Sequence, residues 1–172
     1  MSIVVAVRKG PRIVMGCDSR VGWTGELIAT STTKMFRGPH GSVVGICGDW
    51  RPGHLASRIV HGLAGADLDL SSEVADALSI ALTQKLGTEA EVELILAVGH
   101  SIYMYDSTLV PIKIADDYAA IGSGRPVAIG AMHATYDHHE DPAEVATHGL
   151  AAAVAFCPAW CGPPLHFEEI GL

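Results

Sequence analysis

The segment that decides the fold opens the chain as Met1-Ser2-Ile3-Val4-Val5-Ala6-Val7 and continues, after a turn at Gly10-Pro11, as Ile13-Val14-Met15-Gly16. Both runs are rich in Val and Ile, which predicts two neighbouring strands, Ile3–Val7 and Ile13–Gly16. Neither run alternates cleanly between apolar and polar residues, and this is typical of strands that are covered on both faces. We therefore expect the start of the chain to lie inside a layered sheet structure.

The same segment carries candidate chemistry. If Met1 is removed, Ser2 has both a free α-amine and a hydroxyl, and the reference pKa of such an amine, about 7.7–8.0, lets it accept the hydroxyl proton. An N-terminal hydroxyl activated in this way is a competent nucleophile. Asp18, just after the second strand, and Lys34, set among small residues, would supply the remaining charges. Taken alone, Ser2 is an ordinary second residue, Asp18 a turn residue and Lys34 a surface lysine.

Composition narrows the class of protein. The 172 residues suit a single domain over 1–172. Hydrophobic residues make up 49% of the chain but aromatic ones only 6%, so small aliphatic side chains must fill most of the core. The net charge of −8 argues against a nucleic-acid partner. No apolar run approaches the roughly 20 residues of a membrane span, and no secretory signal is visible, so we expect no membrane association and a cytoplasmic location.

The four cysteines, Cys17, Cys47, Cys157 and Cys161, form no CxxC pair, and we interpret them as buried or free thiols in a reducing compartment. The stretch 133–141 holds three His and three carboxylates, but their spacing fits no standard zinc motif. We interpret this stretch as a polar loop between helices and expect no metal.

The rest of the chain predicts strands and helices in separate runs. Further strands are expected at 42–47, 91–98, 102–105, 109–114, 118–121 and 165–170, helices at 52–66, 71–86, 127–134 and 142–156, and a loop with a short strand at 21–34. This order indicates an α+β fold rather than alternating βαβ units. We expect a four-layer αββα sandwich, with two mainly antiparallel sheets between helix pairs.

Five short motifs, in order and over nearly the whole chain, resemble the proteasome β-subunit and HslV peptidase family of N-terminal nucleophile hydrolases. They are Ser2-Ile3-Val4-Val5-Ala6-Val7-Arg8, Asp18 with Lys34, Val44-Gly45-Ile46-Cys47-Gly48-Asp49, Ala120-Ile121-Gly122-Ser123-Gly124 and His166-Phe167-Glu168-Glu169-Ile170. The resemblance implies the αββα fold and a threonine-type endopeptidase, here with Ser2 as the nucleophile.

The resemblance also implies roles for other residues. Asp18 and Lys34 would be the acidic and basic groups beside the nucleophile, Gly48 the oxyanion-hole glycine and Ser123 a support for the nucleophile, although Ser123 could equally be a helix cap. The implied substrate-pocket positions are Val21, Thr32, Ile46, Trp50 and Phe36, of which Ile46 and Phe36 suit plain core equally well. No cofactor is implied, apart from a monovalent cation near the backbone carbonyls of Ala155, Pro158 and Cys161.

The assembly implied by the resemblance is a homo-oligomer of stacked hexameric or heptameric rings. Its active sites would face an inner chamber, its substrates would be unfolded polypeptides, and an ATPase unfoldase would deliver them.

Three features depart from the family pattern. The usual nucleophile is Thr rather than Ser, the segment 156–162 has no carboxylate where proteasome subunits carry a further Asp, and a retained Met1 would turn the Ser2 amine into an amide. Two alternatives therefore stay open, an inactive ring-forming homologue and a non-peptide amidase. The intact mass of the protein from its native host distinguishes the inactive homologue from an enzyme, because only removal of Met1 frees the amine.

Overall fold

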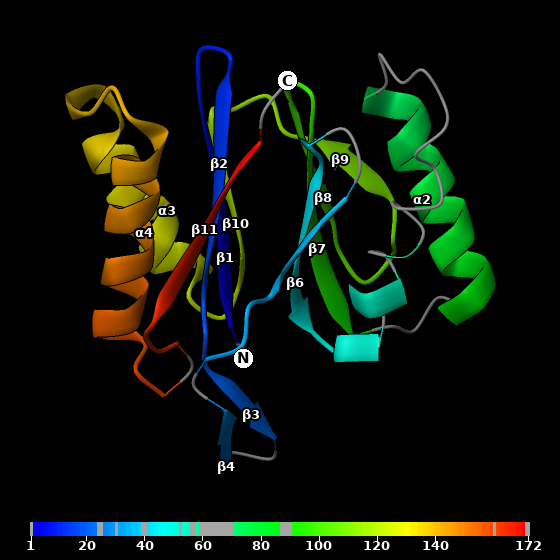
Figure 1. The fold of residues 1–172 in the computed structure, drawn as a ribbon, viewed down its shortest axis with the longest axis horizontal. Coiled ribbons are helices and arrows are strands. Elements are labelled where there is room, and N and C mark those ends of the chain that lie inside the picture. Colours follow the sequence, from blue (N-terminus) through cyan, green and yellow to red (C-terminus); the bar gives the residue numbers. More distant parts are fainter. Residues whose placement is uncertain are drawn as a thin grey trace.

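Two antiparallel sheets lie face to face between layers of helices in the computed structural model (Figure 1). The structure describes residues 2–23, 26–29, 31–38, 41–51, 53–55, 58, 71–86, 91–159 and 161–170. Helices α3 (Arg125–Thr135) and α4 (Pro142–Phe156) cover one sheet, and α2 (Ser71–Leu86) covers the other. This arrangement confirms the predicted α+β sandwich.

The first sheet has four strands in the order β10-β1-β2-β11 and is antiparallel throughout. The strands are β10 (Tyr118–Gly122), β1 (Ile3–Lys9), β2 (Arg12–Asp18) and β11 (Leu165–Ile170). Residues 3–7 of β1 are fully buried, because one face meets the second sheet and the other meets the helices. This double burial explains why the first apolar run shows no alternation.

The second sheet has five antiparallel strands in the order β5-β6-β7-β8-β9. They are β5 (Met35–Arg37), β6 (Val43–Gly48), β7 (Val92–Val98), β8 (Ser101–Tyr105) and β9 (Pro111–Lys113). The last strand is shorter than the predicted 109–114, because Leu109 is buried with a left-handed φ of 59° and cannot extend the strand. A separate hairpin of β3 (Val21–Trp23) and β4 (Glu26–Ala29) replaces most of the predicted loop at 21–34 and projects from the end of the sandwich near Ser2 (Figure 1).

Three apolar cores fill the spaces between the four layers. The core between the sheets is made of aliphatic and sulfur-containing side chains, among them Val4, Met15, Val43, Ile95 and Ile121. Its thinness depends on Gly45 of β6, where a Cβ atom would lie 2.5 Å from Cγ1 of Val4. Small side chains, rather than the scarce aromatic ones, therefore bring the two sheets together.

The helices pack by their apolar faces. In α4, Asp141 caps the N-terminus by accepting a hydrogen bond from the Ala143 N–H at 3.0 Å, and Val145 and Leu150 are buried against the four-stranded sheet. A short 3₁₀ helix, η2 (Tyr136–His138), joins α3 to this cap. The helix predicted at 52–66 lies largely outside the described residues, although 50–51, 53–55 and 58 are helical. Within the described ranges, none of the helices has the length and apolar character to cross a bilayer.

Candidate active site

A buried ion pair of Asp18 and Lys34 lies at the centre of the candidate site. Asp18 ends β2 and Lys34 directly precedes β5, and their side chains are 0% and 2% exposed. Lys34 Nζ donates a short hydrogen bond to Asp18 Oδ1. The Lys34 backbone is fixed from both sheets, because its N–H contacts Cys17 Sγ at 3.4 Å and its carbonyl accepts from the Ile46 N–H at 3.0 Å.

The Asp18 carboxylate is surrounded by hydrogen-bond donors. Besides Lys34, Oδ1 accepts the Ile3 N–H at 3.0 Å, while Oδ2 accepts the N–H groups of Arg20 at 3.1 Å and Gly162 at 3.0 Å. Four donors satisfy a carboxylate that would otherwise be costly to bury. The same bonds tie the first residue of β1 and the segment before β11 to one charged group.

Ser2 lies next to this pair and is itself 7% exposed. Because the Ile3 N–H is bound to Asp18, only one peptide unit separates Ser2 from the ion pair. Gly122, at the end of β10, closes over the Ser2 backbone, and a Cβ at this position would lie 2.3 Å from the Ser2 carbonyl oxygen. With a φ of +94°, Gly122 also has a backbone conformation that favours glycine.

Gly48 lies at the end of a strand, and Ser123 lies in the turn that follows another strand. Gly48 ends β6 with a φ of +99°, and a Cβ there would lie 2.3 Å from the Glu91 carbonyl oxygen, so the position excludes any side chain. Ser123 is exposed in the turn between β10 and α3. The N-cap of α3 is Gly124, without a side-chain cap, so the interpretation of Ser123 as a helix cap is wrong.

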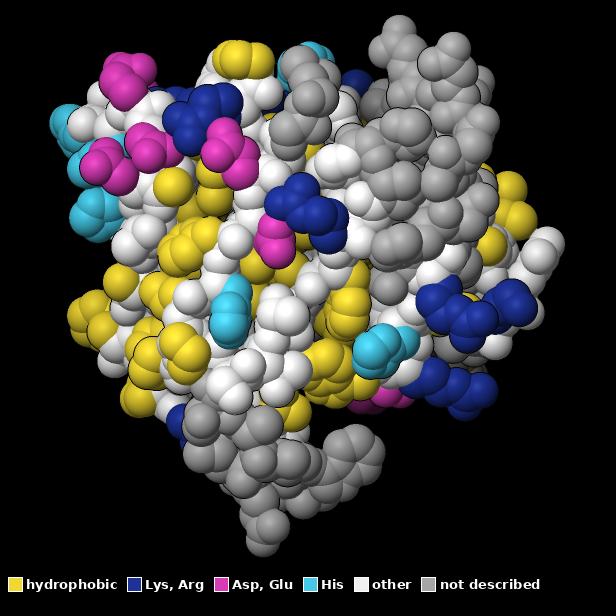
Figure 2. Space-filling model, in the orientation of Figure 1, with side chains coloured by type: hydrophobic (Ala, Val, Ile, Leu, Met, Phe, Trp, Pro, Cys, Tyr) yellow, Lys and Arg dark blue, Asp and Glu magenta, His cyan; other side chains and the backbone are white. Residues whose placement is uncertain are grey.

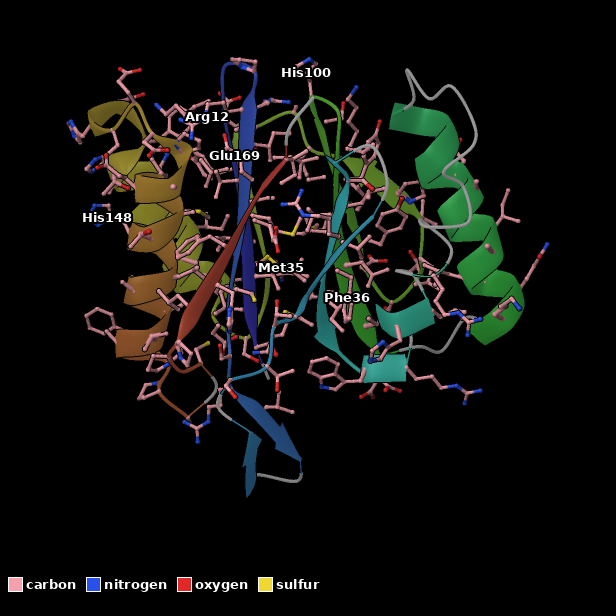
Figure 3. The ribbon with its side chains drawn as sticks, viewed as in Figure 1. Arg12, Met35, Phe36, His100, His148 and Glu169 are labelled. Carbon is pink, nitrogen blue, oxygen red and sulfur yellow. The ribbon has the colours of Figure 1, made fainter. Side chains whose placement is uncertain are left out.

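The implied pocket residues fall into two groups. Ile46 is buried and Trp50 half-buried in the core between the five-stranded sheet and its helices, and Phe36 packs against the same core. Figure 3 labels Phe36 beside Met35 on β5, and these neighbours belong to opposite cores. Val21 begins β3 and Thr32 lies in the segment before β5, both half-buried and outside that core cluster.

Buried thiols surround the ion pair without competing with it. Cys17, Cys47 and Cys161 are buried, Cys157 is half-buried, and all four are free. Burial raises the pKa of Cys17, Cys47 and Cys161, and the positive charge of Lys34 offsets this only partly. These thiols are therefore neutral near pH 7 and fill space, as predicted from the sequence.

One carboxylate near the site, that of Glu93, was not predicted from the sequence. Glu93, on β7, accepts the Gly122 N–H at 2.7 Å and pairs with Arg125 at 3.1 Å. The available signal was a Glu inside the otherwise apolar run Val92–Val98.

The segment expected to hold a monovalent cation is already bound to a cationic side chain. The Arg20 guanidinium donates to the Pro158 carbonyl, one of the three carbonyls named for the cation. A second positive charge at this carbonyl would be repelled, so these residues do not fit the expected cation. Arg20 and the Gly162 N–H instead fasten this segment to the end of β2.

The His-rich stretch forms a polar connection at the surface. His139 pairs with Glu144 at 2.9 Å, and its ring lies 4.8 Å from that of His148, which Figure 3 places on the outer side of α4. In the part of the chain that the structure describes, no three His, Cys, Asp or Glu side chains are arranged to hold a metal ion.

Comparisons with known proteins bear on the family and the fold. No protein-family model matches the chain. The ATP-dependent protease subunit HslV of Caldicellulosiruptor saccharolyticus is 25% identical over 158 residues, which cover 90% of each chain.

Solved structures share the fold. BPH from Thiobacillus denitrificans superposes with a TM-score of 0.80 at 24% identity, over 99% of this chain and 98% of its own. The same protein in complex with epoxomicin gives 0.79 at 22% identity, with the same coverage. HslV from Trypanosoma brucei gives 0.79 at 21% identity, over 97% of this chain and 98% of its own. The chain is thus a relative of HslV and has the fold of the HslV and proteasome β-type N-terminal nucleophile hydrolases.

Proposed function

We propose that this chain is the peptidase subunit of a self-compartmentalising protease and that Ser2 is its nucleophile once Met1 has been removed. The observation that carries the proposal is the buried Asp18–Lys34 pair, one peptide unit from Ser2. Burying a lysine and a carboxylate together contributes little net free energy to folding, because both charges lose their hydration. A buried pair of this kind beside a candidate nucleophile therefore indicates a functional site.

The proposed reaction begins with attack of Ser2 Oγ on the scissile carbonyl carbon. The Ser2 α-amine accepts the hydroxyl proton, and the Lys34 ammonium favours the developing alkoxide. The Gly48 N–H binds the oxyanion, an interaction worth about 2.7–4 kcal/mol in other enzymes. When the C–N bond breaks, the protonated amine passes its proton to the leaving nitrogen and an ester to Ser2 remains. Water then attacks this ester, which releases the acid product and restores the hydroxyl.

The substrate would be an unfolded polypeptide that reaches an inner chamber of stacked rings. The HslV relative is called an ATP-dependent protease subunit, and this supports an ATPase partner for the present chain. Val21, Thr32, Ile46 and Trp50 stay the proposed substrate-binding residues, and Ser123 the proposed support for Ser2.

A second candidate function is an inactive ring-forming homologue. It is favoured by Ser in place of Thr and by the absence of a carboxylate from 156–162. In that case Asp18 and Lys34 would serve only to fasten β1, β2 and the segment before β5.

Intact mass spectrometry of the protein from its native host separates the two functions. The peptidase requires a chain that lacks one Met and begins at Ser2, because only then is the amine free. Finding Met1 on nearly all molecules would exclude the mechanism as proposed. Epoxomicin, which BPH binds, is a suitable second probe, and a mass increase by one epoxomicin that is lost in Ser2→Ala would support Ser2 as the reactive residue.

A further inference from the structure

We propose that Glu93 is a positioning residue that holds the turn at residues 122–125 against Ser2. The inference rests on the function proposed above, since positioning for catalysis requires a reaction. It gives β7 a part in the site, in addition to Gly48 at the end of β6 in the same five-stranded sheet.

Glu93 occupies an unusual place for a carboxylate. It lies on β7, the middle strand of its sheet, and its register partner on β6 is Cys47. Cys47, together with Ile95 and Ala97, belongs to the core between the sheets, so Glu93 faces inward as well. Its side chain is 32% exposed, which puts it at the opening of the sandwich rather than in its interior.

The two oxygens of Glu93 hold the two ends of one turn. Oε2 accepts the N–H of Gly122, the last residue of β10, at 2.7 Å. Oε1 accepts from Nη1 of Arg125, the first residue of α3, at 3.1 Å. Because β10 is the edge strand of its sheet, the Gly122 N–H points to no further strand and Glu93 supplies its acceptor. Ser123 lies between the two contacts.

The contact continues to Ser2. Gly122 is the register partner of Ile3 and lies so close to the Ser2 carbonyl that no Cβ fits between them. A shift of the turn would therefore be transmitted to the Ser2 backbone, and misplacement of a reacting group by 1 Å can cost about 100-fold in rate. Glu93 would act through the backbone and not on the substrate.

Three variants of Glu93 test this role, because they separate the effect of side-chain length from the effect of charge. Glu93→Gln keeps the length and an acceptor for the Gly122 N–H, Glu93→Asp keeps the charge but is one methylene too short, and Glu93→Leu removes both contacts. Glu169→Leu is the matched control, because Glu169 is also an ion-paired strand carboxylate but lies on β11 of the four-stranded sheet, at the end of the sandwich away from Ser2.

Two measurements are made on the assembled protein that begins at Ser2. The first is kcat and KM for a small peptide substrate, and the second is amide hydrogen exchange in peptides that cover residues 118–124. We expect kcat to fall about 10- to 100-fold in Glu93→Asp and Glu93→Leu, with KM changed by less than about 2-fold, and to stay within about 3-fold in Glu93→Gln and Glu169→Leu. Exchange should rise only in the Asp and Leu variants.

Each other outcome overturns part or all of the inference. If Glu93→Asp is as active as wild type while Glu93→Gln is impaired, activity depends on the charge of residue 93 and not on its side-chain length, and Glu93 is not a positioning residue. If exchange is unchanged in Glu93→Asp, Glu93 does not hold the turn. If exchange rises but kcat does not fall, the turn is not part of the catalytic geometry. If wild type without Met1 cleaves no peptide, the proposed function and the catalytic role fail together, and exchange alone decides whether Glu93 fixes the turn.

Discussion

At the scale of single residues, the Asp18–Lys34 pair links the stability of the fold to the proposed chemistry. Replacing Lys34 with Ala removes the ammonium beside Ser2 and leaves a buried carboxylate without its cation. We expect hydrolysis of a small peptide amide to fall at least about 100-fold. We also expect the free energy of unfolding to fall by about 3 kcal/mol, the low end for a broken buried pair, because three N–H donors still bind Asp18. Peptide turnover and denaturant unfolding measure the two effects.

Ser2→Ala is the control for this prediction. It should abolish turnover, yet leave the assembly intact, because it removes one hydroxyl and no charge. If Lys34→Ala cleaves peptides as fast as wild type, Lys34 is not the catalytic lysine.

The buried thiols predict how stability responds to alkaline pH. Burial raises the pKa of the Cys161 thiol to about 12, from the 9.0 of an exposed thiol, and also raises the pKa of Cys17 and Cys47. The unfolded chain therefore loses these protons first as the pH rises. The contribution of Cys161 to stability is complete below about pH 9 and is lost between about pH 9 and 12.

Denaturant unfolding at several pH values, compared between wild type and Cys161→Ala, checks this prediction. The alkaline loss of stability should be smaller in the variant. Equal pH dependence in the two proteins would show that Cys161 ionises in the folded state as readily as in the unfolded one.

At the scale of elements, we expect replacement by Ala to have opposite effects on stability at two glycines. Gly45→Ala places a Cβ 2.5 Å from Val4 and 2.9 Å from Met15, so it should push the sheets apart and cost about 1–3 kcal/mol. Gly130→Ala lies on the exposed side of α3 with nothing within 4 Å, and it should stabilise the protein by about 0.5–1 kcal/mol through helix propensity. Thermal unfolding at equal protein concentration compares them. A Gly45→Ala protein as stable as wild type would mean that the sheets separate without cost.

The elements were largely predictable because their periodicity and end signals are local. The runs at 3–7 and 13–16 became β1 and β2, and Pro142 marked the start of α4 correctly. The hairpin of β3 and β4 was not predicted, since its strands are short and rich in glycine and polar neighbours. The early end of β9 depends on the backbone of Leu109, which no local pattern reveals.

The candidate site was predictable only in part. The resemblance named Asp18 and Lys34, and the structure places them in contact. The hydrogen bond from Gly162 to Asp18 joins residues 144 positions apart in the chain, and the bond from Gly122 to Glu93 joins residues 29 positions apart. Such contacts depend on how the two sheets face each other, which a single sequence does not specify.

At the scale of the whole molecule, exposed apolar side chains predict assembly. Phe156 is 78% exposed at the end of α4, and Figure 2 shows hydrophobic side chains gathered over the face that carries this helix. Exposed apolar surface of this kind is covered in many oligomers. We expect a particle of at least six chains, measured by light scattering over a dilution series. A monomer at micromolar concentration would contradict both this prediction and the proposed inner chamber.

The register of β2 and β11 decides where an affinity handle can be attached. Leu165 lies opposite Asp18 at the end near Ser2, whereas Ile170 lies opposite Ile13 at the other end, where Arg12 and Glu169 pair (Figure 3). The six residues of β11 separate these ends by roughly 17 Å. A handle fused ahead of Ser2 would block its amine, and a protein that is otherwise active would then cleave no substrate. A handle fused beyond Ile170 leaves the amine free and allows the protein to be immobilised with Ser2 facing away from the support.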